Sequence, residues 1–264
     1  MKALILVLSL AVATAAHAES FTVTVEGKGR PMILIPGLSS PASVWDGTAA
    51  HFRDRYEIHR LQLAGFAGAK AIDGAFLPTV RTELAAYIRA KKLDKPVIVG
   101  HSLGGFMAFW LASAEPELVG PVIAVDGLPA LGAIMNATPE QAEGMARFMA
   151  GQTPEQFAFS TRMSLSSMIT NKEELERIAA DAVKSDPATV GRAMKEMLTT
   201  DLRADVAKIT APVLLIGSGE HTAAYEAQVA NIKTKRVVMN KTAKHFIMLD
   251  APAFFYATLE EFLQ

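Results

Sequence analysis

The sequence predicts an α/β fold in which a mostly parallel sheet is flanked by helices on both faces. Strand-like apolar runs alternate with helical patterns along most of the chain. Some runs, such as residues 32–35 and 97–99, are continuously apolar, which is typical of strands buried on both faces. From about residue 129 to 209 only helical patterns occur, and strands resume afterwards. A helical insertion between two late strands is therefore expected.

The elements before this insertion follow from local patterns. Residues 21–25 alternate with period two and end at Gly27, as an edge strand does. A glycine- and alanine-rich loop is expected at residues 65–74. Further strands are expected at 32–35, 56–63, 96–99 and 121–125, with helices at 44–53, 80–88 and 106–112.

The insertion contains four apolar stripes with helical spacing, at residues 142–149, 165–169, 175–182 and 190–198. Three helix starts combine a capping residue with proline at the first helical position: Thr138-Pro139, Thr153-Pro154 and Asp186-Pro187. Strands at 212–216 and 236–239 and a helix at 254–263 complete the chain.

Residues 1–18 have the form of a secretory signal. Lys2 supplies a positive charge, an uncharged apolar stretch follows, and Ala16-His17-Ala18 matches a signal-peptidase site. The apolar stretch is short for a membrane span. We therefore expect a mature chain of residues 19–264 that forms one domain, is periplasmic or secreted, and keeps no stable membrane anchor.

Composition narrows the choice of partner. Without Lys2 the chain has 25 basic and 27 acidic residues, a net charge of −2. This balance gives no basic surface for nucleic acid or for an anionic membrane, and favours a small uncharged molecule. The chain has no cysteine and no His-x-x-x-His pair, so neither a metal nor another cofactor is expected.

The most informative motif is Gly100-His101-Ser102-Leu103-Gly104, which lies between an apolar strand and a helical pattern. Glycines two residues either side of a serine allow a sharp strand-to-helix turn that exposes the hydroxyl. Ser102 is therefore the predicted nucleophile.

A serine nucleophile needs a base, and the base needs an orienting acid. His245 is the favoured base because it follows the last strand, at the sheet edge where the Ser102 strand also ends. The acid is predicted to be Asp126, at the end of the strand that follows the nucleophile helix. Glu220, after the next strand, is the alternative.

With these residues in place, the mature chain resembles the α/β-hydrolase superfamily, and more loosely its small esterases, lipases and cofactor-free perhydrolases. The resemblance rests on the Ser102 elbow, the Pro36-Gly37 loop, and His245 before Asp250-Ala251-Pro252, in the family's order. Two departures are Pro36, where many relatives have histidine, and Glu220-His221, where aspartate is usual.

The resemblance also implies an oxyanion hole and a cap. In this fold class the hole uses the amide after the nucleophile, here Leu103, and an amide of an early loop, here Leu38. The helical insertion at about 129–209 would cover the active site. Seven of the twelve methionines lie there, and they fit either an adaptable apolar pocket or packing between helices.

These observations favour hydrolysis of a carboxylic ester or thioester of a small to medium, uncharged, partly apolar substrate, through an acyl-enzyme on Ser102. The alternatives are a cofactor-free perhydrolase or haloperoxidase-like enzyme, and a non-catalytic ligand-binding protein of the same fold. A haloalkane dehalogenase is disfavoured because its nucleophile is a carboxylate, whereas this elbow carries Ser102.

Overall fold

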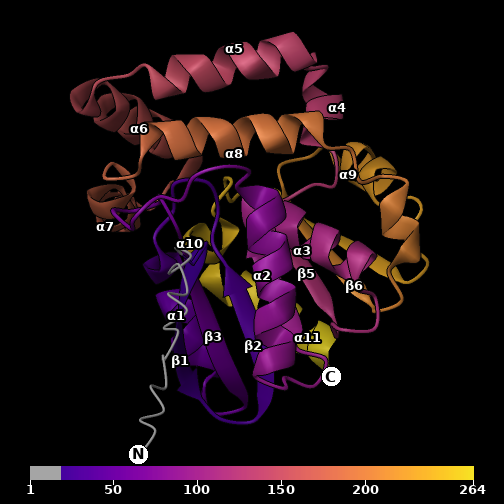
Figure 1. Ribbon diagram of the computed structural model, residues 1–264. Coiled ribbons are helices and arrows are strands. Elements are labelled where there is room, and N and C mark those ends of the chain that lie inside the picture. The colour runs from indigo at the N-terminus through magenta and orange to yellow at the C-terminus, as the bar shows by residue number, and fades with distance from the viewer. Residues whose placement is uncertain (1–18) are drawn as a thin grey trace, which may run out of the picture.

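A seven-stranded sheet forms the centre of the computed structural model, which describes residues 19–264 (Figure 1). The strand order is β1-β3-β2-β4-β5-β6-β7; β1 pairs antiparallel with β3 and all other pairs are parallel. The predicted fold class is confirmed. The predicted signal sequence lies outside the described residues.

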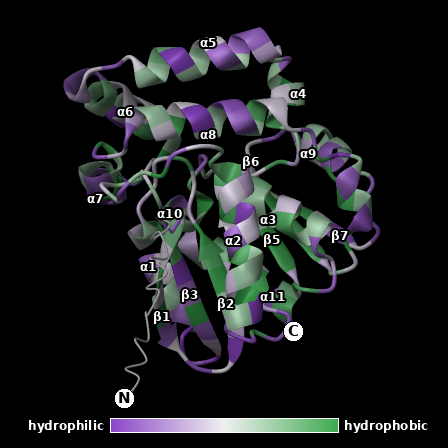
Figure 2. Cartoon of the chain, viewed as in Figure 1, coloured by the Kyte–Doolittle hydropathy of each residue, from purple (hydrophilic) through white to green (hydrophobic). Residues whose placement is uncertain are grey.

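Each strand expected from the sequence is present, with slightly wider bounds in most cases. The strands are β1 (Phe21–Gly27), β2 (Arg30–Ile35), β3 (Tyr56–Leu63), β4 (Val97–His101), β5 (Val122–Val125), β6 (Val213–Ser218) and β7 (Lys235–Asn240). The central strands are the most hydrophobic part of the sheet, as Figure 2 shows in green, because helices cover both of their faces.

Helices outside the insertion pack on the two faces of this sheet. They are α1 (Asp46–Phe52), α2 (Leu77–Ala90), α3 (Leu103–Ala114), α9 (Thr222–Gln228), α10 (Ile247–Asp250) and α11 (Pro252–Leu263), with 3₁₀ turns at Ala42–Trp45 and Asp205–Lys208. The short helices α9 and α10 are additions to the sequence prediction, since they contain too few turns to show a periodic pattern.

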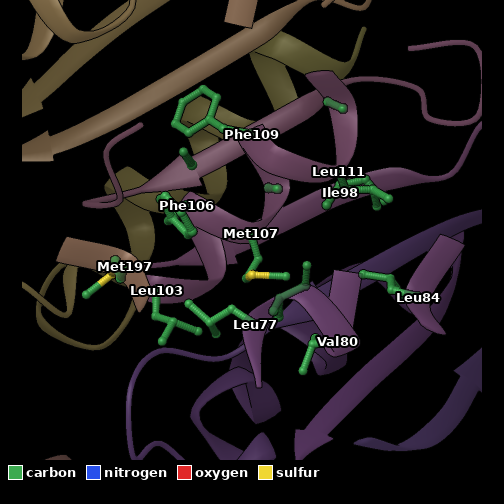
Figure 3. Close-up of a cluster of buried hydrophobic side chains, with 14 of the residues drawn as sticks. Leu77, Val80, Leu84, Ile98, Leu103, Phe106, Met107, Phe109, Leu111 and Met197 are labelled. Carbon is green, nitrogen blue, oxygen red and sulfur yellow. The ribbon is translucent and has the colours of Figure 1, made fainter. Parts of the chain in front are cut away.

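The helix that follows Ser102 is the most deeply buried. Leu103, Phe106 and Met107 of α3 are fully buried and pack in one cluster with residues of α2 (Figure 3). Met197 belongs to the same cluster and comes from the helical insertion. The end of the sheet that carries Ser102 is therefore held rigidly and is in direct contact with the insertion.

The insertion forms a helical cap between β5 and β6, at the top of Figure 1. Its helices are α4 (Leu131–Met135), α5 (Pro139–Ala150), α6 (Pro154–Met168), α7 (Lys172–Ala182) and α8 (Pro187–Thr199). Thr138 and Thr153 each form a capping box and Asp186 caps α8, so the three predicted helix starts are confirmed.

Polar side chains fasten the cap to the loops below it. The Glu196 carboxylate of α8 accepts hydrogen bonds from the backbone amides of Phe76 and Leu77, at 2.9 and 2.7 Å. The Asp250 carboxylate accepts from the amides of Thr170 and Asn171, at 2.8 and 3.1 Å. These four hydrogen bonds join two separate segments of the cap to the part of the chain outside it.

Candidate active site

Ser102 lies between β4 and α3 in a strained conformation, with φ 53° and ψ −115°. Its backbone amide still donates to the carbonyl of Val125 at 2.8 Å, so the turn continues the pairing of β4 with β5. A Cβ atom at Gly100 would collide with the carbonyl of Gly104, and one at Gly104 would collide with the carbonyl of Ile35. The elbow therefore requires glycine at both positions, as the sequence motif indicates.

Asp126 follows β5 and has a positive φ of 48°. Its carboxylate accepts four hydrogen bonds: from the Ser218 amide at 2.9 Å, the Ser218 hydroxyl at 2.9 Å, the Tyr225 hydroxyl at 2.6 Å and His245 Nδ1 at 2.6 Å. The Asp126 side chain is only 6% exposed. A buried carboxylate with four donors is fully satisfied and fixed in orientation.

These contacts determine the charge of the Asp126 carboxyl group. Burial alone would raise the pKa of Asp126, but the hydrogen bonds from His245, Tyr225 and Ser218 hold it below its ordinary value. Burial and the adjacent carboxylate of Asp126 raise the pKa of Tyr225, so its hydroxyl stays protonated and donates. Asp126 is therefore an anion at neutral pH.

His245 lies in the loop between β7 and α10. Because ionised Asp126 can only accept, His245 Nδ1 carries the proton in their hydrogen bond, which leaves Nε2 as the ring nitrogen directed away from Asp126. His245 and Ser102 line the same cavity. Among the described residues no hydrogen bond joins Ser102 Oγ to His245; such bonds are often long in a free enzyme and shorten around substrate.

The alternative acid is placed elsewhere. The Glu220 side chain is 77% exposed, and its charged partner is Lys241, at 3.9 Å. Of the two carboxylates weighed from the sequence, the structure brings Asp126 and not Glu220 to His245.

Ser218 and Tyr225 were not anticipated from the sequence. Ser218 ends β6, which pairs directly with β5, and so its amide and hydroxyl both reach Asp126. Tyr225 lies in α9, which has no periodic signal. The strand that carries Ser218 was predictable, but its adjacency to the Asp126 strand was not.

His101, next to Ser102 in the sequence, holds the backbone of His245 in place. It is fully buried, and Nε2 donates to the backbone carbonyl of His245 at 3.1 Å. Burial, followed by the nearby His245, holds the pKa of His101 well below its usual range, so the ring is neutral. Nδ1 has no hydrogen-bond partner among residues 19–264 and faces Gly37, where a Cβ would come within 2.8 Å. His101 thus joins the end of β4 to the loop that carries His245.

The two residues expected to form the oxyanion hole flank Ser102. Leu103 is the first residue of α3, where a backbone amide has no partner within the helix. Leu38 lies in the turn after β2 and lines the cavity beside Ser102. Both amides are at the carboxyl edge of the parallel strands, where ligands bind in open α/β sheets.

The cavity above Ser102 has a volume of about 540 Å³ and lies between the sheet edge and the cap. Among the described residues, its lining includes no aspartate, glutamate, lysine or arginine. The cap contributes an apolar wall, with a smaller polar part, made of Leu131, Phe148, Met149, Gln152, Phe157, Ser160, Thr161, Ser164, Leu165, Met168, Val190, Met194 and Met197. This composition suits an uncharged, largely apolar ligand.

Two features are absent from residues 19–264. No group of three or more metal-binding side chains is present in this part of the chain. No helix in it is long and apolar enough to cross a membrane.

Comparison with known proteins identifies the class to which the fold and site belong. The model of the alpha/beta hydrolase family matches residues 32–258. The chain belongs to this family, as the sequence motifs indicate.

Individual relatives fit the same class. The chain is 25% identical over 256 residues to a pimeloyl-[acyl-carrier protein] methyl ester esterase of Aeromonas hydrophila, covering 91% of this chain and 99% of the relative. It is 23% identical over 194 residues to 3-oxoadipate enol-lactonase 2 of Acinetobacter baylyi, covering 72% of each. The crystal structure of an enol-lactonase from Burkholderia xenovorans has the same fold, with a TM-score of 0.79, 19% identity, and coverage of 92% of this chain and 96% of that one.

Proposed function

We propose that the protein is a serine hydrolase that cleaves a carboxylic ester or thioester of a small to medium, uncharged, partly apolar substrate. The observation that carries this proposal is the hydrogen bond between Asp126 and His245, because His245 and Ser102 line one largely apolar cavity. Esterase and enol-lactonase relatives support hydrolysis of an ester bond.

In the proposed reaction, His245 Nε2 takes the proton of Ser102 as its Oγ attacks the substrate carbonyl. Asp126 holds the imidazole in the required tautomer and stabilises the imidazolium ion that forms. The amides of Leu38 and Leu103 stabilise the negative charge on the carbonyl oxygen. His245 then protonates the leaving group, and water releases the acyl group from Ser102.

The test is a panel of p-nitrophenyl esters from acetate to palmitate, with purified protein and its Ser102→Ala variant. We expect turnover by the parent and a loss on the order of 10⁶-fold in kcat for the variant. Equal turnover by both proteins would refute the role of Ser102. Turnover only when hydrogen peroxide is added would favour a perhydrolase instead.

We also propose that the protein is exported and that residues 1–18 are removed. The pattern of charge, apolar stretch and small residues at Ala16 and Ala18 supports this. Expression of the full chain with N-terminal sequencing tests it: the expected first residue is Glu19 in a periplasmic or extracellular fraction. An intact Met1 in the cytoplasmic fraction would contradict export.

A further inference from the structure

A second hollow opens in the cap, beside the cavity above Ser102. It has a volume of about 490 Å³ and lies between the end of α5 and the start of α6. Phe148, Gln152 and Ser160 line both hollows. The two spaces are therefore neighbours that share one wall.

The shared wall is compatible with an apolar chain. Ser160 Oγ donates to Gln152 Oε1 at 3.1 Å, so the Gln152 oxygen is paired within the wall. Phe148 supplies an apolar ring to both hollows, although 69% of the residue is exposed. A passing alkyl chain would cover this ring.

The outer hollow shows no feature built for an anion. Its charged residue is Arg147, whose side chain is 74% exposed and lies 4.0 Å from Glu143. Phe159 also lines the hollow and is 70% exposed, and Met163 one turn further along α6 is 56% exposed. Such a group of exposed apolar side chains is typical of a surface that a ligand covers.

We propose that the outer hollow is a second substrate subsite, which holds the far part of an extended alkyl or acyl chain whose ester group lies at Ser102. The proposal rests on the proposed function and narrows it to esters with a chain longer than the inner cavity holds. The chain would run past Phe148 and end against Phe159.

The test measures binding without turnover. Linear methyl ketones from 2-hexanone to 2-tetradecanone are uncharged analogues of an ester, and their Kd for the Ser102→Ala protein can be measured by calorimetry. Full burial of a methylene is worth about a fourfold change in affinity. For the half-open outer hollow we expect about a twofold decrease in Kd per methylene, continuing to the longest ketones.

Variants of Phe159 in the same background locate the effect. Phe159→Asp should reduce the affinity ratio between the longest and shortest ketones at least fivefold, because it places a charge beside the chain. Phe159→Leu should keep the ratio. Ile134→Asp is the matched control, since Ile134 is also an exposed apolar residue of the cap but lines neither hollow. An equal ratio in Phe159→Asp and Ile134→Asp would overturn the proposal.

A measurement without surface substitutions gives an independent result. In NMR spectra of the Ser102→Ala protein, 2-tetradecanone should shift the Phe159 ring signals and 2-hexanone should not. Unshifted Phe159 signals at saturation would also overturn the proposal. If the wild type hydrolyses esters but ketone affinity does not increase with chain length, the subsite alone fails. If long ketones bind as expected but no ester is cleaved, the proposed function alone fails.

Discussion

The carboxyl edge of the sheet and the cap differ in how many polar groups they contain and how those groups are held. At the sheet edge, Asp126 is almost fully buried and accepts four hydrogen bonds, one of them from His245. In the cap, apolar side chains that include several methionines line the cavity, and Phe148 and Phe159 are exposed. One region fixes a few polar atoms, and the other offers an apolar surface.

This difference predicts how the two regions respond to substitution. A hydrogen-bonded network in a buried site loses its function when one member is removed, because the remaining groups are left unpaired or misoriented. A wall of flexible apolar side chains can repack around a change in volume. Substitutions at the sheet edge should therefore affect kcat, and substitutions in the cap should affect KM and substrate choice.

The largest effect is expected for His245→Ala, which removes the proposed base. We expect kcat for p-nitrophenyl butanoate to fall on the order of 10⁶-fold, as for other members of such triads. His51→Ala is a control, because His51 lies in α1, pairs with Glu260 and does not line the cavity. Activity of His245→Ala within tenfold of the parent would show that the base has been misassigned.

The next effect separates the two candidate acids. Asp126→Asn should lower kcat by up to roughly 10⁴-fold, because an amide can stabilise the wrong imidazole tautomer. Glu220→Gln should stay within about twofold, since the Glu220 side chain is exposed and pairs with Lys241. Steady-state kinetics of the two variants side by side give the answer, and the reverse order would make Glu220 the acid.

A smaller effect is expected for Tyr225→Phe, which removes one donor to Asp126. A hydrogen bond to a charged group contributes about 1.5–3 kcal/mol. The hydrogen bonds lower the pKa of folded Asp126, so the stabilisation is present above the unfolded value and is lost as pH falls through the folded one. Tyr225→Phe removes one of these hydrogen bonds, so the pKa of folded Asp126 should be lowered less. The pH at which stability and kcat fall on the acid side should therefore be higher in the variant.

Acid unfolding followed by circular dichroism, together with the pH dependence of kcat, checks this prediction. Tyr87→Phe is a suitable comparison, because Tyr87 also has a hydrogen-bonded hydroxyl but contacts His59 and not the site. If both tyrosine variants shift the acid limb of kcat equally, Tyr225 has no specific effect on Asp126.

The smallest effect is expected in the cap. Met168→Ala removes part of the apolar wall of the cavity. We expect KM for p-nitrophenyl butanoate to rise about three- to tenfold while kcat changes less than twofold. Met135→Ala is the control, because Met135 is 52% exposed and does not line the cavity. A large decrease in kcat for Met168→Ala would contradict the division between the two regions.

The same division explains what could be predicted from the sequence. The strands, the Ser102 elbow and the first residues of the insertion's helices have local sequence signatures. Burial on two faces constrains the strand residues, the sharp turn constrains the elbow, and N-terminal capping constrains the helix starts. The choice of acid has no local signature, since Asp126 and Glu220 both follow strands that end at one edge. In the structure they are distinguished by the hydrogen bond between His245 and Asp126 and by the exposure of Glu220.

In the cap, the sequence predicts where helices begin but not which side chains face the cavity. Its helix starts were predictable from Thr138, Thr153 and Asp186, but the pattern of apolar residues left open which methionines face the cavity. Met149, Met168, Met194 and Met197 line it, whereas Met135 and Met163 are exposed. An amphipathic stripe defines the inner face of a helix and does not show whether that face packs on a helix or borders a ligand site.

The central claim is that Ser102 is a nucleophile activated by His245 and Asp126, and labelling with a fluorophosphonate tests it most directly. The reagent reacts with an activated serine hydroxyl, and peptide mass spectrometry identifies the modified residue. We predict a single adduct on Ser102, no adduct in Ser102→Ala, and strongly slowed labelling in His245→Ala and Asp126→Asn. Labelling of another serine, or unchanged labelling of the Ser102→Ala protein, would contradict the account.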